Sequence, residues 1–135
     1  MTTALGLLTA AMLVAGRPAP QAPIPAPHVS PFACDRLALD PAARHRHFDE
    51  LGPMLRSMRK ATRELADGYE FEFAGDSKTY ALLNEWAQGE RLCCPFFDIV
   101  VRAERESGAI WLRLTGRAGT KDFIKSDFPA PWMGK

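Results

Sequence analysis

The chain has 135 residues and a formal net charge of +1, from 17 basic and 16 acidic side chains. Its length is that of one domain, and 47% hydrophobic with 24% charged residues is ordinary for a soluble globular protein. The balanced charge gives no electrostatic basis for binding nucleic acid or an acidic membrane surface. A glycine-rich phosphate loop of either common type is absent from the sequence.

The first 31 residues differ from the rest. Residues 1–16 are free of charged side chains and contain an apolar run, typical of a signal peptide and shorter than the roughly 20 residues of a membrane span. Residues 17–31 are rich in proline and read as a semi-rigid linker. We predict an exported protein, periplasmic or extracellular, with no membrane span in its mature form. Because no basic residue precedes the apolar run, a cytoplasmic protein with an over-long start is the alternative.

A single domain is predicted over residues 32–128, followed by a loose tail at 129–135. Residues 32–37 read as a short edge strand. Asp40-Pro41 predicts a helix start, because aspartate caps a helix and proline suits its first turn. Gly52-Pro53 then predicts a kink or a break in this helix, since proline lacks the backbone donor.

Residues 67–73 show the clearest strand pattern, with aromatic residues alternating with Glu70 and Glu72, so that one face should be buried and the other solvated. Residues 77–93 form the next predicted helix, capped by Asp76 or Ser77. Pro95 ends it, because the residue before a proline is displaced from the helical region.

Residues 96–116 read as a hairpin with Ser107-Gly108 in its turn, and Thr120 is expected to cap a short last helix through Ile124. The predicted order is strand, helix, strand, helix, strand, strand, short helix. This order predicts an α+β fold, a small sheet of about four strands with two main helices packed on one face.

The three cysteines are the main functional signal. Cys93 and Cys94 are adjacent, just before Pro95, and Cys34 lies far away in the sequence. An odd number indicates one disulfide with a free thiol, a metal site, or pairing between chains. A disulfide between the adjacent pair would strain the peptide that joins them. A bridge from Cys34 to one of the pair would close a loop of about 60 residues and add about 4 kcal/mol.

A soft-metal site is the functional hypothesis that we favour. Thiolates select soft ions of the copper, zinc and mercury class. Because Cys94 should leave the helix, the sulfurs of Cys93 and Cys94 could converge with that of Cys34. The chain would then be a binding or sequestration module rather than an enzyme. Its partner would be a metal ion or a small thiol-reactive species. Glu90 and Arg91 could orient a thiol from the preceding turn.

Two other functions remain open. A thiol–disulfide redox protein is the first, although its reactive cysteine normally lies at a helix N-terminus. Here the pair ends a helix, where the dipole disfavours a thiolate, and only Arg91 could offset this. The second is a structural or interaction domain, in which the cysteines are inert buried residues or are disulfide-bonded.

Other polar and aromatic residues give weaker signals. His45 and His47 are two apart, so on a helix they diverge by about 200°, and we expect both to be solvated. We therefore expect no histidine to complete a tetrahedral zinc site. Glu90 is as readily a surface ion pair with Arg91 as a partner of a thiol. Trp86 and Trp111 are expected in the core or on a sheet face.

Two motifs carry a resemblance to a known family. "ERLCCPFF" and "IWLRLTGRAGTKDFI" resemble a family of small uncharacterised bacterial proteins. These share Glu-Arg-x-Cys-Cys-Pro-Phe, a strand ending Leu-x-Leu-Thr-Gly, and an early cysteine matched by Cys34. The similarity spans about residues 32–124, with Arg117-Ala118 in place of the usual Pro-Glu. It implies one compact domain and a role for the cysteines, and it supplies no activity.

Overall fold

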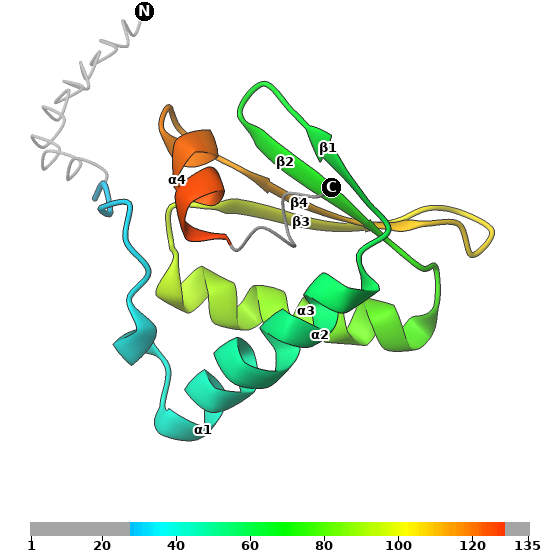
Figure 1. Cartoon of the computed structure of the whole chain (residues 1–135), viewed down its shortest axis with the longest axis horizontal. Coiled ribbons are helices and arrows are strands. Elements are labelled where there is room, and N and C mark those ends of the chain that lie inside the picture. Colours follow the sequence, from blue (N-terminus) through cyan, green and yellow to red (C-terminus); the bar gives the residue numbers. More distant parts are fainter. Residues whose placement is uncertain (1–27, 129–135) are drawn as a thin grey trace, which may run out of the picture.

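The computed structural model describes residues 28–128 (Figure 1). The predicted leader (1–16), most of the linker (17–31) and the tail (129–135) lie outside this range. The elements in chain order are η1 (Arg36–Ala38), α1 (Pro41–His45), the π-helical turn η2 (Arg46–Leu51), α2 (Gly52–Met58), β1 (Ala61–Glu64), β2 (Gly68–Phe73), α3 (Ser77–Cys93), β3 (Asp98–Ala103), β4 (Ile110–Thr115) and α4 (Thr120–Asp127).

The four strands form one antiparallel sheet in the order β1-β2-β4-β3. Helices α2 and α3 lie on the same side of this sheet (Figure 1). The predicted α+β class, with about four strands and two main helices on one face, is therefore confirmed. None of the helices within residues 28–128 is long and apolar enough to cross a membrane.

The core lies between the sheet and these helices. Alternate residues of β2 and β4 point into it, as their period-2 pattern predicts. It includes Leu51, Leu55, Phe71, Phe73, Leu83, Leu112, Leu114 and Ile124, each at most 1% exposed. Cys93 and Cys94 belong to the same cluster and are fully buried.

The first predicted strand was misplaced. Residues 32–37 form no strand, because the backbone there is used otherwise: the Asp35 amide donates to the Cys93 carbonyl at 2.7 Å, and the Asp35 side chain caps η1. The strand that completes the four-stranded sheet is instead β1, which follows α2 and pairs with β2. It was missed because its residues are half-buried or exposed and carry no apolar alternation.

Gly52-Pro53 was expected to kink the first long helix or to break it into two pieces. The helix does not break, and its hydrogen bonding changes locally instead. The chain passes from α1 through η2 into α2 without leaving helical geometry. In η2 the hydrogen bonds widen, so that the Gly52 amide donates to the His47 carbonyl, five residues back. The wide turn places Pro53 at the start of α2, where its missing amide hydrogen is not needed.

Two smaller expectations were also wrong. Glu70, predicted on the solvated face of its strand, is only 1% exposed, because Arg63 and Arg113 lie over it and bond its carboxylate. Thr120 is the first residue of α4, and the cap is Gly119 in the left-handed conformation (φ 100°).

Several local predictions are confirmed. Helix α3 runs from Ser77 to Cys93, capped by the Asp76 carboxylate, and the hairpin β3–β4 forms where the alternation predicted it. Trp86 is in the core and Trp111 lies on the sheet, both buried.

Candidate functional site

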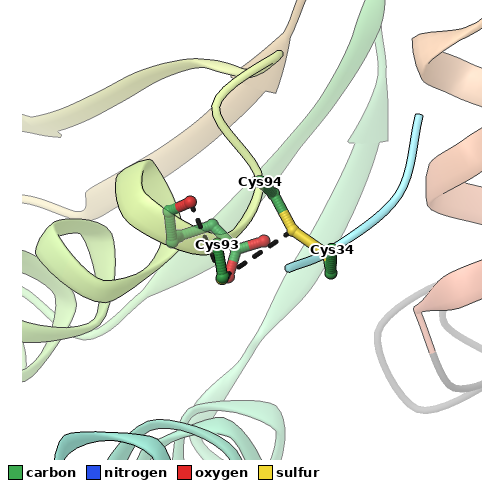
Figure 2. Close-up of side chains that lie close together, drawn as sticks. Cys34, Cys93 and Cys94 are labelled. Carbon is green, nitrogen blue, oxygen red and sulfur yellow. Dashed lines mark hydrogen bonds between the residues drawn. A yellow bond between two sulfur atoms is a disulfide. The ribbon is translucent and has the colours of Figure 1, made fainter. Parts of the chain in front are cut away.

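The three cysteines meet at the C-terminal end of α3. Cys93 is the last residue of the helix. Cys94 leaves helical geometry (φ −126°, ψ 66°), as expected before Pro95. The hydrogen bond from Asp35 to the Cys93 carbonyl holds the N-terminal segment beside this helix end. Cys34 is thereby brought next to the pair, as predicted (Figure 2).

Cys34 and Cys94 form a disulfide, and Cys93 remains a free thiol (Figure 2). The bridged residues are 60 positions apart in the sequence, and their Cα atoms are separated by 4.7 Å. Of the arrangements open to an odd number of cysteines, the structure shows one bridge with one thiol. A disulfide is compatible with export, because such bonds persist in oxidising compartments.

The free Cys93 thiol lies among three potential ligand atoms. Its Sγ is 3.8 Å from Cys94 Sγ, 3.7 Å from Glu90 Oε2 and 3.9 Å from His47 Nε2. Burial, and then the negative charge of Glu90, raise the pKa of Cys93 to about 12. The resting residue is therefore a protonated thiol, which donates to Glu90.

Glu90 and His47 form a buried pair behind this thiol. Glu90 Oε2 lies 2.9 Å from His47 Nε2, and both side chains are 4% exposed. Two expectations are corrected here. Glu90 is not paired with Arg91 at the surface, and His47 is not solvated. The predicted divergence of the two histidines does hold, since the side chain of His45 is 66% exposed.

Aromatic rings and a glycine position the His47 ring. Trp86 stacks against it with centroids 5.6 Å apart, and Phe48 meets it edge-on at 4.6 Å. On the α3 side, a Cβ at Gly89 would lie 2.4 Å from His47 Nδ1. Only glycine at position 89 leaves room for the ring. The sequence did hold a signal for this, because His47 and Leu51 are four apart on one helical stripe.

Four side chains at this site could hold a metal ion. The Sγ atoms of Cys34, Cys93 and Cys94 and a carboxylate oxygen of Glu90 all lie within 4.8 Å of one another. Three of these residues were the predicted site, and Glu90 was its predicted neighbour. Arg91, the other predicted neighbour, is exposed, and among residues 28–128 no hydrogen bond or ion pair links it to the site.

A groove of about 630 Å³ opens onto the site. Cys34, His47 and Glu90 line it, whereas Cys93 and Cys94 do not. Four aromatic residues form part of its walls, and charged residues of both signs also line it. The aromatic residues are Phe32, Phe48, Trp86 and Phe128, and the basic ones are Arg36 and Arg56. Cys34 is partly exposed and the other two cysteines are fully buried. The groove therefore reaches the disulfide from the Cys34 side.

No protein-family model, no curated protein and no solved structure matches this chain. The resemblance to the Glu-Arg-x-Cys-Cys-Pro-Phe family therefore stays a prediction.

Proposed function

We propose that the reduced protein binds one soft metal ion, of the zinc or copper(I) class, through Cys34, Cys93 and Cys94. The fourth ligand would be Glu90 or His47. The protein would act as a binding or sequestration module outside the cytoplasm. The observation that carries this proposal is the close approach of three sulfurs and one carboxylate in a buried site.

The distances suit an ion with sulfur ligands. A zinc–thiolate bond of about 2.3 Å gives sulfur–sulfur separations of about 3.8 Å in a tetrahedral site. The separation of Cys93 and Cys94 is 3.8 Å, and Glu90 Oε2 lies 3.7 Å from Cys93 Sγ. Reduction of the disulfide would let the Cys34 and Cys94 sulfurs move apart to a similar separation. A small movement of side chains would then complete the site.

The electrostatics favour a cation over a free thiolate. Burial and Glu90 hold Cys93 in its protonated form, and a metal ion reverses this by supplying the missing positive charge. Binding would then release the proton from Cys93, and affinity should rise with pH. The buried pair of Glu90 and His47 gives the ion either an anionic or a neutral fourth ligand. The disulfide-bonded form, with two sulfurs engaged, would be closed to metal.

Titration of the reduced protein under anaerobic conditions tests this proposal. Zinc or copper(I) would be added in competition with a chromophoric chelator. We expect one ion per chain, and at least about 100-fold weaker binding in each single Cys→Ala variant, since even residues beyond the ligands change affinity by about 10–100-fold. Glu85→Gln, an exposed carboxylate of the same helix, should bind like the wild type. A wild type that binds no tighter than the Cys93→Ala/Cys94→Ala variant would overturn the proposal.

Thiol–disulfide exchange is the second candidate, favoured by one observation. The Cys93 thiol lies 3.8 Å from the bonded sulfur of Cys94, so the Cys93 thiolate could attack that sulfur, form a Cys93–Cys94 disulfide and release Cys34 as a thiolate. That product carries the strain of a disulfide between adjacent residues. The raised pKa of Cys93 opposes this at rest, because the thiolate is the attacking form. Multiple-turnover reduction of a disulfide substrate, lost in Cys34→Ala, would favour this candidate over metal binding.

A further inference from the structure

We propose that the groove at Cys34 binds a small organic thiol carrying a carboxylate, and that this thiol opens the Cys34–Cys94 disulfide by attacking Cys34. The biological use of this reaction rests on the proposed function, since reduction of the disulfide would open the metal site. Its chemistry and its test concern the disulfide alone.

The direction of attack follows from access. Of the two cysteines in the disulfide, only Cys34 lines the groove, and it is partly exposed. Cys94 is 0% exposed and lies within the hydrophobic core. Thiol–disulfide exchange depends on which sulfur the incoming thiolate can reach. An external thiol in the groove therefore reaches Cys34 and leaves Cys94 as the departing group.

Two arginines that line the groove can bind the carboxylate of a ligand. Arg36 lies with its guanidinium carbon 3.8 Å from the centre of the Phe48 ring, and Arg56 also lines the groove. Within residues 28–128 neither arginine forms an ion pair with a carboxylate. Three carboxylates also line the groove: Asp49 lies beside His45, Glu90 beside His47, and Asp127 accepts a hydrogen bond from the Ser126 hydroxyl. The preference for an anionic ligand therefore rests on the two arginines and not on the net charge of the groove.

The size and walls of the groove suit a small organic molecule. About 630 Å³ is within the range of small-molecule sites, and such sites combine apolar walls with a few charged groups. The aromatic walls would cover the carbon skeleton of the ligand. An arginine would bind its carboxylate through paired N–H donors.

The reduction of the disulfide takes two thiol–disulfide exchange steps, in each of which one sulfur–sulfur bond forms and one breaks. A thiolate RS⁻ attacks Cys34 Sγ, the Cys34–Cys94 bond breaks, and its electron pair leaves on Cys94 Sγ, which takes up a proton. The product is a mixed disulfide between R and Cys34. A second RS⁻ attacks the R sulfur, giving RSSR and the Cys34 thiolate, which is then protonated. Two external thiols are oxidised to one disulfide, and the protein disulfide is reduced to two thiols.

The experiment compares three thiols on the oxidised protein without metal. The probes are 3-mercaptopropionate (anionic), 2-mercaptoethanol (neutral) and 2-aminoethanethiol (cationic), at equal thiolate concentration and low salt. Reactions are quenched by alkylation and followed by intact mass. Each rate is divided by the rate of the same thiol with a small neutral disulfide, because intrinsic thiolate nucleophilicity rises with thiol pKa. On this corrected scale we expect the anionic thiol to react on the order of tenfold faster than the cationic one, the scale of one hydrogen bond to a charged group. Peptide mapping should find the mixed disulfide on Cys34.

A pair of variants isolates the groove. Arg36→Gln/Arg56→Gln should abolish the preference for the anionic thiol. The control variant Lys78→Gln/Arg105→Gln removes the same charge from exposed positions elsewhere. It should retain the preference for the anionic thiol. An adduct on Cys94, equal corrected rates for the three thiols, or an unchanged preference in the groove variant would each overturn the proposal. These results need no metal, so a failure here is distinguishable from a failure to bind zinc or copper(I).

Discussion

Replacing Gly89 by alanine should reverse the usual effect of this substitution in a helix. Alanine normally stabilises a helix interior by about 1 kcal/mol relative to glycine. Here the new Cβ would lie 2.4 Å from His47 Nδ1, so the ring must retreat by about 1 Å to reach an ordinary contact. That retreat lengthens the 2.9 Å bond from His47 Nε2 to Glu90 beyond hydrogen-bonding reach.

The expected size of the Gly89→Ala effect follows from the buried carboxylate. A buried polar group without its partner destabilises a fold by about 1–3 kcal/mol, and more when it is charged. The net result should be a loss of up to about 2 kcal/mol in the free energy of unfolding, measured by urea denaturation. In a His47→Ala background the obstacle is gone, so Gly89→Ala should there stabilise by about 1 kcal/mol. Stabilisation by Gly89→Ala in the wild type would refute this reasoning.

Three further predictions concern the disulfide, the free thiol and the N-terminal segment. In the oxidised protein, Cys34→Ala should lower the free energy of unfolding by about 4 kcal/mol, because the bridge closes a long loop, whereas Cys93→Ala should lower it by about 1–2 kcal/mol. Under reducing conditions, urea denaturation should show most of the Cys34→Ala loss gone, because the wild type then lacks the bridge as well. The pKa of Cys93 is raised to about 12 from 9.0, so the folded state retains this proton while the unfolded state loses it. Stability should therefore fall as pH rises from about 9 towards 12, by up to about 1.4 kcal/mol per pH unit; a Cys93→Ala variant with the same high-pH slope would contradict this. Removing residues 1–27 should leave cooperative thermal unfolding intact, because the packing of Phe32 on Phe96 and Phe123 is retained. Loss of the cooperative transition would show that the missing residues belong to the fold.

Local sequence patterns predicted the elements whose signal is strong. Helix α3 and the hairpin β3–β4 carry clear periodicity, and Asp76 and Pro95 mark the helix ends. Strand β1 was missed because an edge strand with polar residues has no apolar alternation. The helix through Pro53 was predicted to kink or break. The continuous helix was not foreseen, because a π-helical turn that makes room for proline has no recognisable pattern in a single sequence.

The cysteine site was predicted in part, and its missing members show why. Cys34, Cys93 and Cys94 could be grouped because thiols are rare and the pair is adjacent. The spacing of His47 from Leu51 indicated a buried position, but the neighbours of its ring could not be assigned, because Gly89 and Trp86 belong to a different helix. Its pairing with Glu90 follows from the same contact. The choice of Cys94 over Cys93 as partner of Cys34 likewise depends on how the chain leaves α3 before Pro95.

X-ray absorption at the metal edge tests most directly whether three sulfurs hold one ion. The protein would be reduced, loaded with one equivalent of zinc under anaerobic conditions, and freed of unbound metal. The proposed site predicts three sulfur neighbours at about 2.3 Å and one nitrogen or oxygen neighbour at about 2.0–2.1 Å, with one sulfur fewer in Cys93→Ala. A wild-type spectrum with only oxygen and nitrogen neighbours, or with no zinc retained, would contradict the proposed metal site.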